Sequence, residues 1–147
     1  MDTDPIILAL SEQVACYRRL AKLAEVQHEH VQNSQTEQLL EVLRSRQTVL
    51  DQIAEFERVI VPAKRRWSEY LESLEPGTRA RAEALMAETR ALLEKITTAD
   101  RNDALVLQQR KLNLGRQINQ VSAARQVNRN YAASAYGRAP SQMDVQR

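Results

Sequence analysis

Apolar residues return at alternating steps of three and four along this chain, and that spacing constrains its fold more than any other feature of the sequence. The first such series is Ile7, Leu10, Val14, Tyr17, Ala21, Ala24, His28 and Val31. These steps place successive residues along one side of an α-helix, as in a coiled-coil seam. Asp4 can cap free amides, and Pro5 tolerates the first helical position. The pattern predicts a helix from about residue 5 to residue 32.

A second seam follows a break in the pattern at Asn33 and Ser34. Its members are Leu39, Val42, Arg46, Val49, Ile53, Phe56, Ile60, Ala63, Trp67, Tyr70 and Leu74, and a flanking apolar stripe is formed by Leu40, Leu43 and Leu50. Arg46 is the only charged member. Ser34 and Glu37 have the spacing of a capping box, so we expect a helix over residues 35–74.

Pro62 interrupts this second seam, because it lacks a backbone N–H and crowds the carbonyl of Arg58. The seam keeps its phase through Ala63, Trp67 and Tyr70. We therefore expect a kinked but continuous helix, and a full break into two helices is the alternative.

The segment Glu75-Pro76-Gly77 predicts a turn, and a third helix is expected over residues 78–133. The first part of its seam is Ala82, Leu85, Thr89, Leu92, Ile96 and Ala99. The seam then resumes, shifted by about one position, at Leu107, Leu114, Ile118 and Val121. Gly115 disfavours helix and marks a place for a bend, whereas Gly137 and Pro140 end the pattern.

These patterns predict an all-α fold, an elongated antiparallel three-helix bundle or coiled-coil hairpin. We expect a single helical domain over residues 1–133 and a flexible tail over residues 134–147. The third helix is the longest, so its C-terminal part should extend beyond its neighbours. An amphipathic segment of that kind should be mobile alone and order against a partner.

Charge is distributed unevenly along the chain. Residues 1–100 hold 13 basic and 17 acidic groups, whereas residues 101–147 hold 8 basic and 2 acidic groups. Such asymmetry indicates a C-terminal part that meets an acidic partner surface, although a solvated polar helix face is equally compatible with it. The basic residues are diluted by Gln and Asn and form no dense stripe, so nucleic acid is not the expected partner.

The sequence contains little that could support catalysis. Glycines are too scattered for a phosphate loop, and His28 and His30 point to different faces of one helix, so they cannot chelate a metal together. Cys16 is the only cysteine and is expected to be a buried structural thiol. We expect no enzyme activity, no cofactor and no metal site.

Hydropathy and the N-terminus favour a cytoplasmic protein. The longest apolar runs, Ile6–Leu10 and Val59–Ala63, are far shorter than the roughly 20 residues that span a bilayer, so no stable membrane insertion is expected. The opening Met-Asp-Thr-Asp has no basic residues before an apolar stretch and so does not match a secretory signal.

Several segments give the chain a resemblance to the FlgN family of flagellar export chaperones, which includes FliT-like relatives. These segments are Leu20-Ala21-Lys22-Leu23-Ala24-Glu25, Glu37-Gln38-Leu39-Leu40-Glu41-Val42-Leu43, residues 44–53, Leu92-Leu93-Glu94-Lys95-Ile96 with Asp100 and Leu105, and the terminal Asn130-Tyr131-Ala132-Ala133-Ser134-Ala135-Tyr136-Gly137. The resemblance covers nearly the whole chain, and the Ala-Tyr-Gly ending is its most discriminating piece.

The resemblance implies a chaperone that binds flagellar hook-associated proteins, of the junction or the cap, and delivers them to an export gate protein. It implies that the C-terminal helix binds the cargo and that a tyrosine, Tyr131 or Tyr136, contacts the gate. From the seam itself, a cargo helix would lie against Leu107, Leu114, Ile118 and Val121. The alternative is a self-associating coiled-coil scaffold or structural adaptor, in which the same seams close a homodimer.

Overall fold

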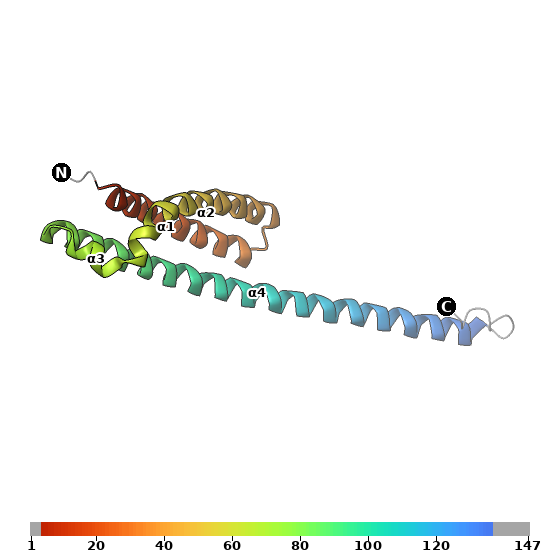
Figure 1. Cartoon of the computed structure of the whole chain (residues 1–147). Coiled ribbons are helices and arrows are strands. Elements are labelled where there is room, and N and C mark those ends of the chain that lie inside the picture. The colour runs from red at the N-terminus through yellow and green to blue at the C-terminus, as the bar shows by residue number, and fades with distance from the viewer. Residues whose placement is uncertain (1–3, 137–147) are drawn as a thin grey trace. The chain divides into compact units, whose positions relative to one another are not determined.

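The structure is a computed structural model that describes residues 4–136, the last three of them by their backbone only. It contains helices α1 (Pro5–Gln32), α2 (Thr36–Arg65), α3 (Trp67–Glu72) and α4 (Pro76–Tyr136) (Figure 1). No strand occurs between residues 4 and 136, so the predicted all-α class is confirmed.

The chain divides into two compact units, an N-terminal unit that ends at Val106 and a C-terminal unit that begins at Leu107. Each unit is described by itself. The expected extension of the last helix beyond its neighbours concerns both units and stays a prediction. Of the expected tail at residues 134–147, the backbone of 134–136 belongs to α4, and 137–147 lie outside the described residues.

Helix α1 has the bounds that the seam predicts. The Asp4 carboxylate accepts hydrogen bonds from the backbone amides of Ile6, at 2.7 Å, and Ile7, at 3.4 Å, and Pro5 occupies the first turn. These amides have no partner within the helix, so the side chain supplies what the first turn lacks.

The turn from α1 to α2 differs from the expected capping box. Ser34 has a positive φ of 55° and closes α1: its amide bonds to the Val31 carbonyl, and the Gln35 amide bonds to the His30 carbonyl. This pair of bonds is the Schellman arrangement. The N-cap of α2 is therefore Gln35, which makes no side-chain cap bond, and the predicted capping by Ser34 was wrong because that residue ends the preceding helix.

The predicted continuous helix over residues 35–74 is broken at Arg66. Helix α2 runs through Pro62 to Arg65, and Arg66 leaves the helical region with φ −129° and ψ 50°. The Arg66 amide bonds to the carbonyl of Ala63 instead of the one four residues back, so the last turn tightens before the chain turns into α3. The break that was the alternative is thus observed, four residues after the proline.

The connection from α3 to α4 lies earlier than expected. Residues 73–75 form the connection, and Pro76 is already the first residue of α4, a position where its missing N–H costs nothing. The Arg79 side chain donates to the carbonyls of Leu71 and Leu74, which satisfies acceptors at the end of α3.

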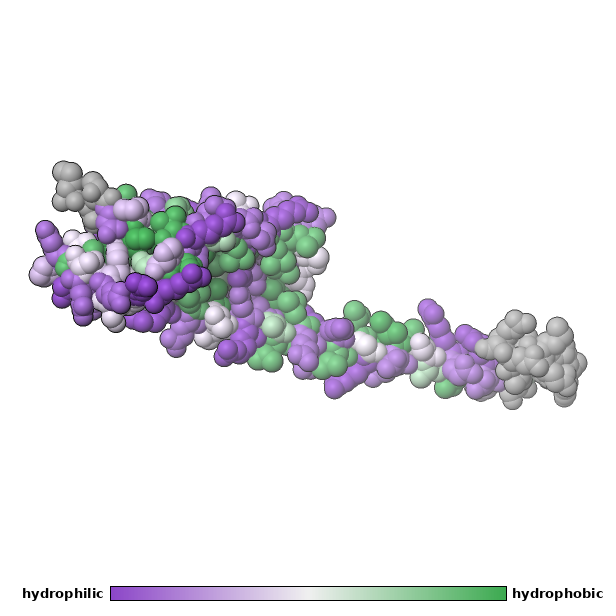
Figure 2. All heavy atoms as spheres, viewed as in Figure 1, coloured by the Kyte–Doolittle hydropathy of each residue, from purple (hydrophilic) through white to green (hydrophobic). Residues whose placement is uncertain are grey.

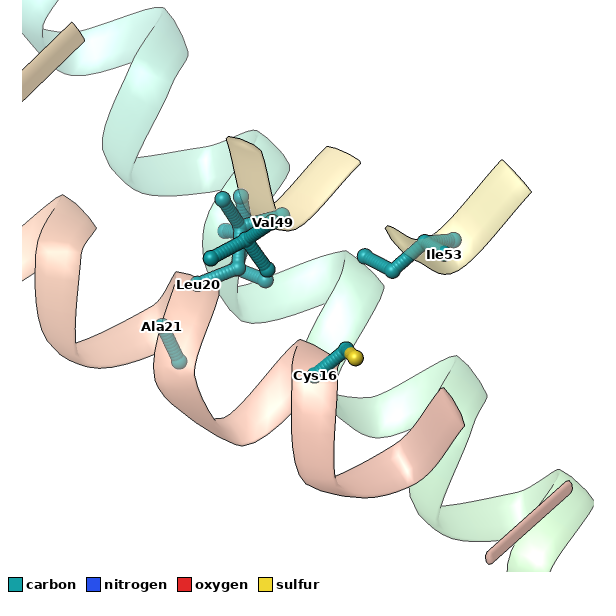
Figure 3. Packing of buried hydrophobic residues seen from close by; sticks show 6 residues of the cluster. Cys16, Leu20, Ala21, Val49 and Ile53 are labelled. Atoms are coloured by element: carbon teal, nitrogen blue, oxygen red, sulfur yellow. The ribbon is translucent and has the colours of Figure 1, made fainter. Parts of the chain in front are cut away.

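Two clusters of buried residues form the core of the N-terminal unit. One contains Ile7, Ala9, Leu10, Ile60 and Ala82, and the other contains Cys16, Leu20, Ala21, Val49, Ile53 and Ile96. Figure 3 shows the second cluster, with Leu20 of α1 against Val49 of α2. Both clusters join α1, α2 and α4, so the three seams pack together here.

Helices α1 and α2 are antiparallel, because residues later in α1 bond to residues earlier in α2. Gln13 bonds to the Ile53 carbonyl and Gln27 to Arg46. The first part of α4 instead runs parallel to α1, because Arg18 pairs with Glu88 and, later in both helices, Gln27 bonds to Asp103.

A polar cluster follows the two apolar ones along the N-terminal unit. Arg46 donates two bonds of 2.7 Å to Asp100 and one of 2.6 Å to Gln27. Asp103 is only 2% exposed and accepts from Gln27, while His28 lies 2.8 Å from its other oxygen. The cluster ties all three helices, because Asp100 and Asp103 belong to α4.

Candidate functional site

The C-terminal unit presents four large aliphatic side chains on one side of its helix. Their exposed fractions are 43% for Leu107, 57% for Leu114, 57% for Ile118 and 52% for Val121. Steps of seven, four and three residues bring them within about 60° of one another around an α-helix. We call these four residues the apolar stripe. Figure 2 shows apolar side chains recurring among polar ones over this segment.

The two tyrosines of the expected site are not part of the apolar stripe. Tyr131 is 71% exposed and, at 100° per residue, lies roughly 110° from the middle of the stripe. Tyr136 is the last residue of α4, and the structure describes its backbone but not its side chain. The helix therefore brings four of the six predicted residues together and places Tyr131 on a different side.

Other exposed apolar residues of this unit were not among the expected site residues. Leu112 is 52% exposed and Val127 is 63% exposed, and both lie on the side opposite the stripe. The heptad pattern does not single them out, because they are isolated between polar neighbours. They provide a natural comparison for any experiment on the stripe.

A shallow depression adjoins the stripe at Gly115. Its lining residues are Leu107, Gln108, Lys111, Leu112, Gly115, Arg116 and Asn119. A Cβ built on Gly115 would meet no atom within 4 Å, so no close contact inside the chain requires this glycine. Glycine within a helix costs about 1 kcal/mol relative to alanine. The described chain contains no packing contact that offsets this cost.

The charge around the stripe has one sign. Residues 107–136 contain five basic residues and no acidic residue. At 100° per residue, four of the basic residues lie within about 60° of the middle of the stripe. Those four are Arg110, Lys111, Arg125 and Arg129. The stripe is therefore an aliphatic surface bordered by cations.

A second exposed aliphatic group lies on α2 in the N-terminal unit. Leu40, Leu43 and Leu50 are between 41% and 49% exposed. In the sequence these three leucines flank the second seam, and in the structure the core does not cover them. At 100° per residue, Asp51 and Arg44 both lie within about 90° of the middle of this group, so charges of both signs flank it.

Among the described residues, every buried side-chain nitrogen or oxygen has a hydrogen-bond partner. Burial alone would raise the pKa of Glu57, but hydrogen bonds from Gln13 and Lys64 outweigh it and lower that pKa. Burial raises the pKa of Tyr17, and the nearby Glu57 carboxylate adds to the effect. Cys16 is 1% exposed, which confirms the predicted buried thiol.

The histidines take up separate interactions, as their spacing predicts. The imidazole of His28 lies beside Asp103, and Nδ1 of His30 is 2.7 Å from Oε1 of Gln35. Within residues 4–136, no group of three or more His, Cys, Asp or Glu side chains is arranged to hold a metal ion. None of the helices in this range combines the length and apolar character needed to cross a membrane.

Comparison with known proteins gives no relative from which a role could be transferred: no family model, no curated protein and no solved structure matches the chain significantly.

Proposed function

We propose that this chain is a flagellar export chaperone of the FlgN type, which binds a hook-associated protein, of the junction or the cap, and delivers it to the export gate. The cargo would present an amphipathic helix to the apolar stripe. The flagellar assignment comes from the sequence resemblance, and the mode of binding comes from the surface of the C-terminal unit.

One observation supports this proposal more than the others: the apolar stripe is exposed. Leu107, Leu114, Ile118 and Val121 are each at least 43% accessible although they are large and lie on one side of a helix. An amphipathic helix with an uncovered apolar side gains free energy when another apolar surface covers it. Helix-against-helix recognition uses side chains at this spacing.

Co-purification with a junction or cap protein tests the proposal. The double variant Leu114→Asp/Ile118→Asp places two charges on the stripe, and we expect it to lose the cargo. The matched control is Leu112→Asp/Val127→Asp, which adds the same charges to exposed positions on the opposite side. Retention of cargo by the first variant, or equal loss by both, would show that the stripe is not the binding surface.

Cargo binding and gate docking would use separate sides of the helix under this proposal, because Tyr131 lies away from the stripe. We expect Tyr131→Ala or Tyr136→Ala to retain cargo and to lose binding to the gate protein. A pull-down with each partner separates the two activities. Loss of cargo in either variant would contradict this division.

The second group on α2 favours a self-associating scaffold as the other candidate function. Leu40, Leu43 and Leu50 are exposed on the N-terminal unit, as the apolar stripe is on the C-terminal unit. Two copies could therefore cover both groups. Light scattering with and without a hook-associated protein distinguishes the functions, because a stable dimer that ignores the cargo supports the scaffold.

A further inference from the structure

We infer that two copies of this chain pair through α2, with the two helices antiparallel and the exposed leucines Leu40, Leu43 and Leu50 between them. We call these three residues the α2 leucines. The inference goes beyond the proposed function, because it concerns a surface of the N-terminal unit and uses no residue of the apolar stripe.

The α2 leucines lie on a side of α2 that the N-terminal unit leaves exposed. At 100° per residue they fall within about 80° of one another, and they are between 41% and 49% accessible. Gln47 and Ala54 extend the same steps of three and four residues, and both are exposed. This is the spacing of a coiled-coil seam, and a seam of this kind gains free energy when a second helix covers it.

One edge of the α2 leucines carries charges that alternate in sign. A charged residue occurs there at every seventh position, and the four residues are Glu37, Arg44, Asp51 and Arg58. Seven residues are nearly two turns of an α-helix, so the four lie almost in line along it. All four are exposed. The edge therefore presents an acidic, a basic, an acidic and a basic group in turn.

The bonds that these residues make within the chain leave their charges available. Arg58 pairs with Glu55 at 3.0 Å, but the two side chains are 74% and 66% exposed, and a pair of that exposure contributes little free energy. Asp51 accepts a hydrogen bond of 2.9 Å from the side-chain amide four residues earlier, which leaves its charge uncompensated. Within residues 4–136, Glu37 and Arg44 have no partner of opposite charge.

An antiparallel arrangement of two copies brings opposite charges together along this edge. When two α2 helices cross near residue 47, Arg44 of each copy comes next to Asp51 of the other, and Glu37 next to Arg58. Both kinds of pair share one midpoint, between residues 47 and 48, so one two-fold axis forms all four pairs. The α2 leucines span this midpoint, and those of the two copies interleave.

A parallel arrangement offers these charges no partners. In a parallel coiled coil each edge of one helix faces the opposite edge of the other helix. The opposite edge of α2 is already occupied within the N-terminal unit, because Arg46 donates to Asp100 there and Ile53 is buried in the core. The charged edge therefore selects the antiparallel orientation.

The order of the charges also favours a second copy over a different protein. A partner with charges of one sign meets a like charge at every second position of this edge, which disfavours binding. A second copy in reverse direction supplies the same four charges in the complementary order. The sequence of α2 thus contains both halves of the interface.

Charge reversal tests the antiparallel pairing. Arg44→Glu and Asp51→Arg each place like charges opposite one another at two points of the dimer, so we expect either to raise the dimer dissociation constant about tenfold at low salt. Mixing the two variants should restore association, because in the mixed dimer each reversed charge faces an opposite one. Sedimentation equilibrium measures all three samples, and the control is Arg90→Glu, which reverses an exposed charge on α4.

A mixture that associates no better than its separate components would overturn the antiparallel pairing. So would a dimer that Arg44→Glu and Arg90→Glu weaken equally. The effect of Arg44→Glu should also shrink as salt screens the pairs.

Leu43→Asp tests the apolar part of the interface. We expect this variant to be monomeric at about 100 µM, where the unmodified chain forms a dimer. Its control is Leu8→Asp, which adds the same charge at a 51% exposed position of α1. Circular dichroism checks that both variants remain helical. A monomeric unmodified chain at this concentration, or equal loss of the dimer in both variants, would overturn the inference.

Cargo binding separates this inference from the proposed function. We expect Leu43→Asp to retain a hook-associated protein, because the cargo is proposed to use the apolar stripe. Loss of the cargo would mean that the cargo, and not a second copy, covers the α2 leucines, which overturns the inference. A monomeric chain that still co-purifies with a hook-associated protein also overturns it, and the proposed function then stands.

Discussion

The guanidinium of Arg46 in α2 donates two hydrogen bonds to the carboxylate of Asp100 in α4, each 2.7 Å long, across a sequence separation of 54 residues. The hydrogen bond to Asp100 raises the pKa of Arg46, so the guanidinium stays charged. Its side chain is 12% exposed and that of Asp100 is 38% exposed. A charged residue on an otherwise apolar seam is thus matched by an acceptor on the third helix, and a third bond reaches Gln27.

Arg46→Met should destabilise the N-terminal unit by about 1–3 kcal/mol, because it keeps most of the packing of the stem but leaves Asp100 and Gln27 without their donor. Urea unfolding followed by circular dichroism measures the change. The control is Arg58→Met, which removes an exposed pair with Glu55 and should cost less than about 0.5 kcal/mol. Equal effects of the two substitutions would show that the Arg46 cluster adds no more than a surface pair.

Stability should fall in acid partly through Glu57. Burial opposes its ionisation, but its bonds to Gln13 and Lys64 prevail and lower its pKa below the ordinary 4.5. A carboxylate with a lowered folded pKa stabilises the fold above the unfolded pKa, and this contribution is lost as pH falls through the folded pKa. We expect Glu57→Gln to lower the free energy of unfolding at pH 7, and the deficit to shrink below pH 4.5. A deficit that is constant with pH would contradict this.

Ser34→Gly should stabilise the chain by a few tenths to about 1 kcal/mol. Glycine adopts the left-handed conformation without the unfavourable contact between Cβ and the following carbonyl oxygen that serine makes. Ser34 holds φ 55° in the Schellman turn after α1. Thermal unfolding measures the gain, and Ser34→Ala, which keeps the Cβ, should show none. A gain of the same size in the alanine variant would mean that the backbone conformation is not the cause.

Hydrogen exchange should distinguish the two parts of α4. The buried residues Ala82, Thr89, Ile96 and Asp103 lie before Leu107, whereas the large apolar residues described after Val106 are exposed. Amides that no packing protects open with little free energy, so those of residues 107–133 should exchange faster than those of 82–103. Adding the cargo should slow exchange around the apolar stripe. Equal exchange in both parts, with no change on binding, would contradict the proposed role of that surface.

The sequence accounts well for where the helices are and which sides they bury. The seam from Ile7 to Val31 predicted the bounds of α1, and the seam members Leu10, Ile53, Ile60 and Ile96 are buried. Burial on one side of a helix must repeat with the helical period, and this repetition leaves a direct trace in the sequence. The apolar stripe follows the same spacing, although its four residues are exposed.

Local competition between backbone conformations was harder to predict. Ser34 matches a capping box and instead closes α1, and the second seam passes Arg66 in phase although the helix breaks there. In both places two local arrangements satisfy the same few amides and carbonyls. Their difference in free energy is small beside that of the surrounding packing, so the tertiary structure decides between them.

The sequence by itself determined an all-α chain, the full or partial burial of the apolar seam members up to Ala99, and a segment over residues 107–136 with aliphatic residues on one side and only basic charges. Tertiary structure alone decided that Arg46 meets Asp100, that Gln27 and Asp103 are buried together, and that Leu40, Leu43 and Leu50 remain uncovered. The physical reason is the distance along the sequence over which each kind of interaction acts. Periodicity records how each helix faces its neighbours, whereas the pairing of polar groups far apart in sequence depends on the register between helices, which no single helix encodes.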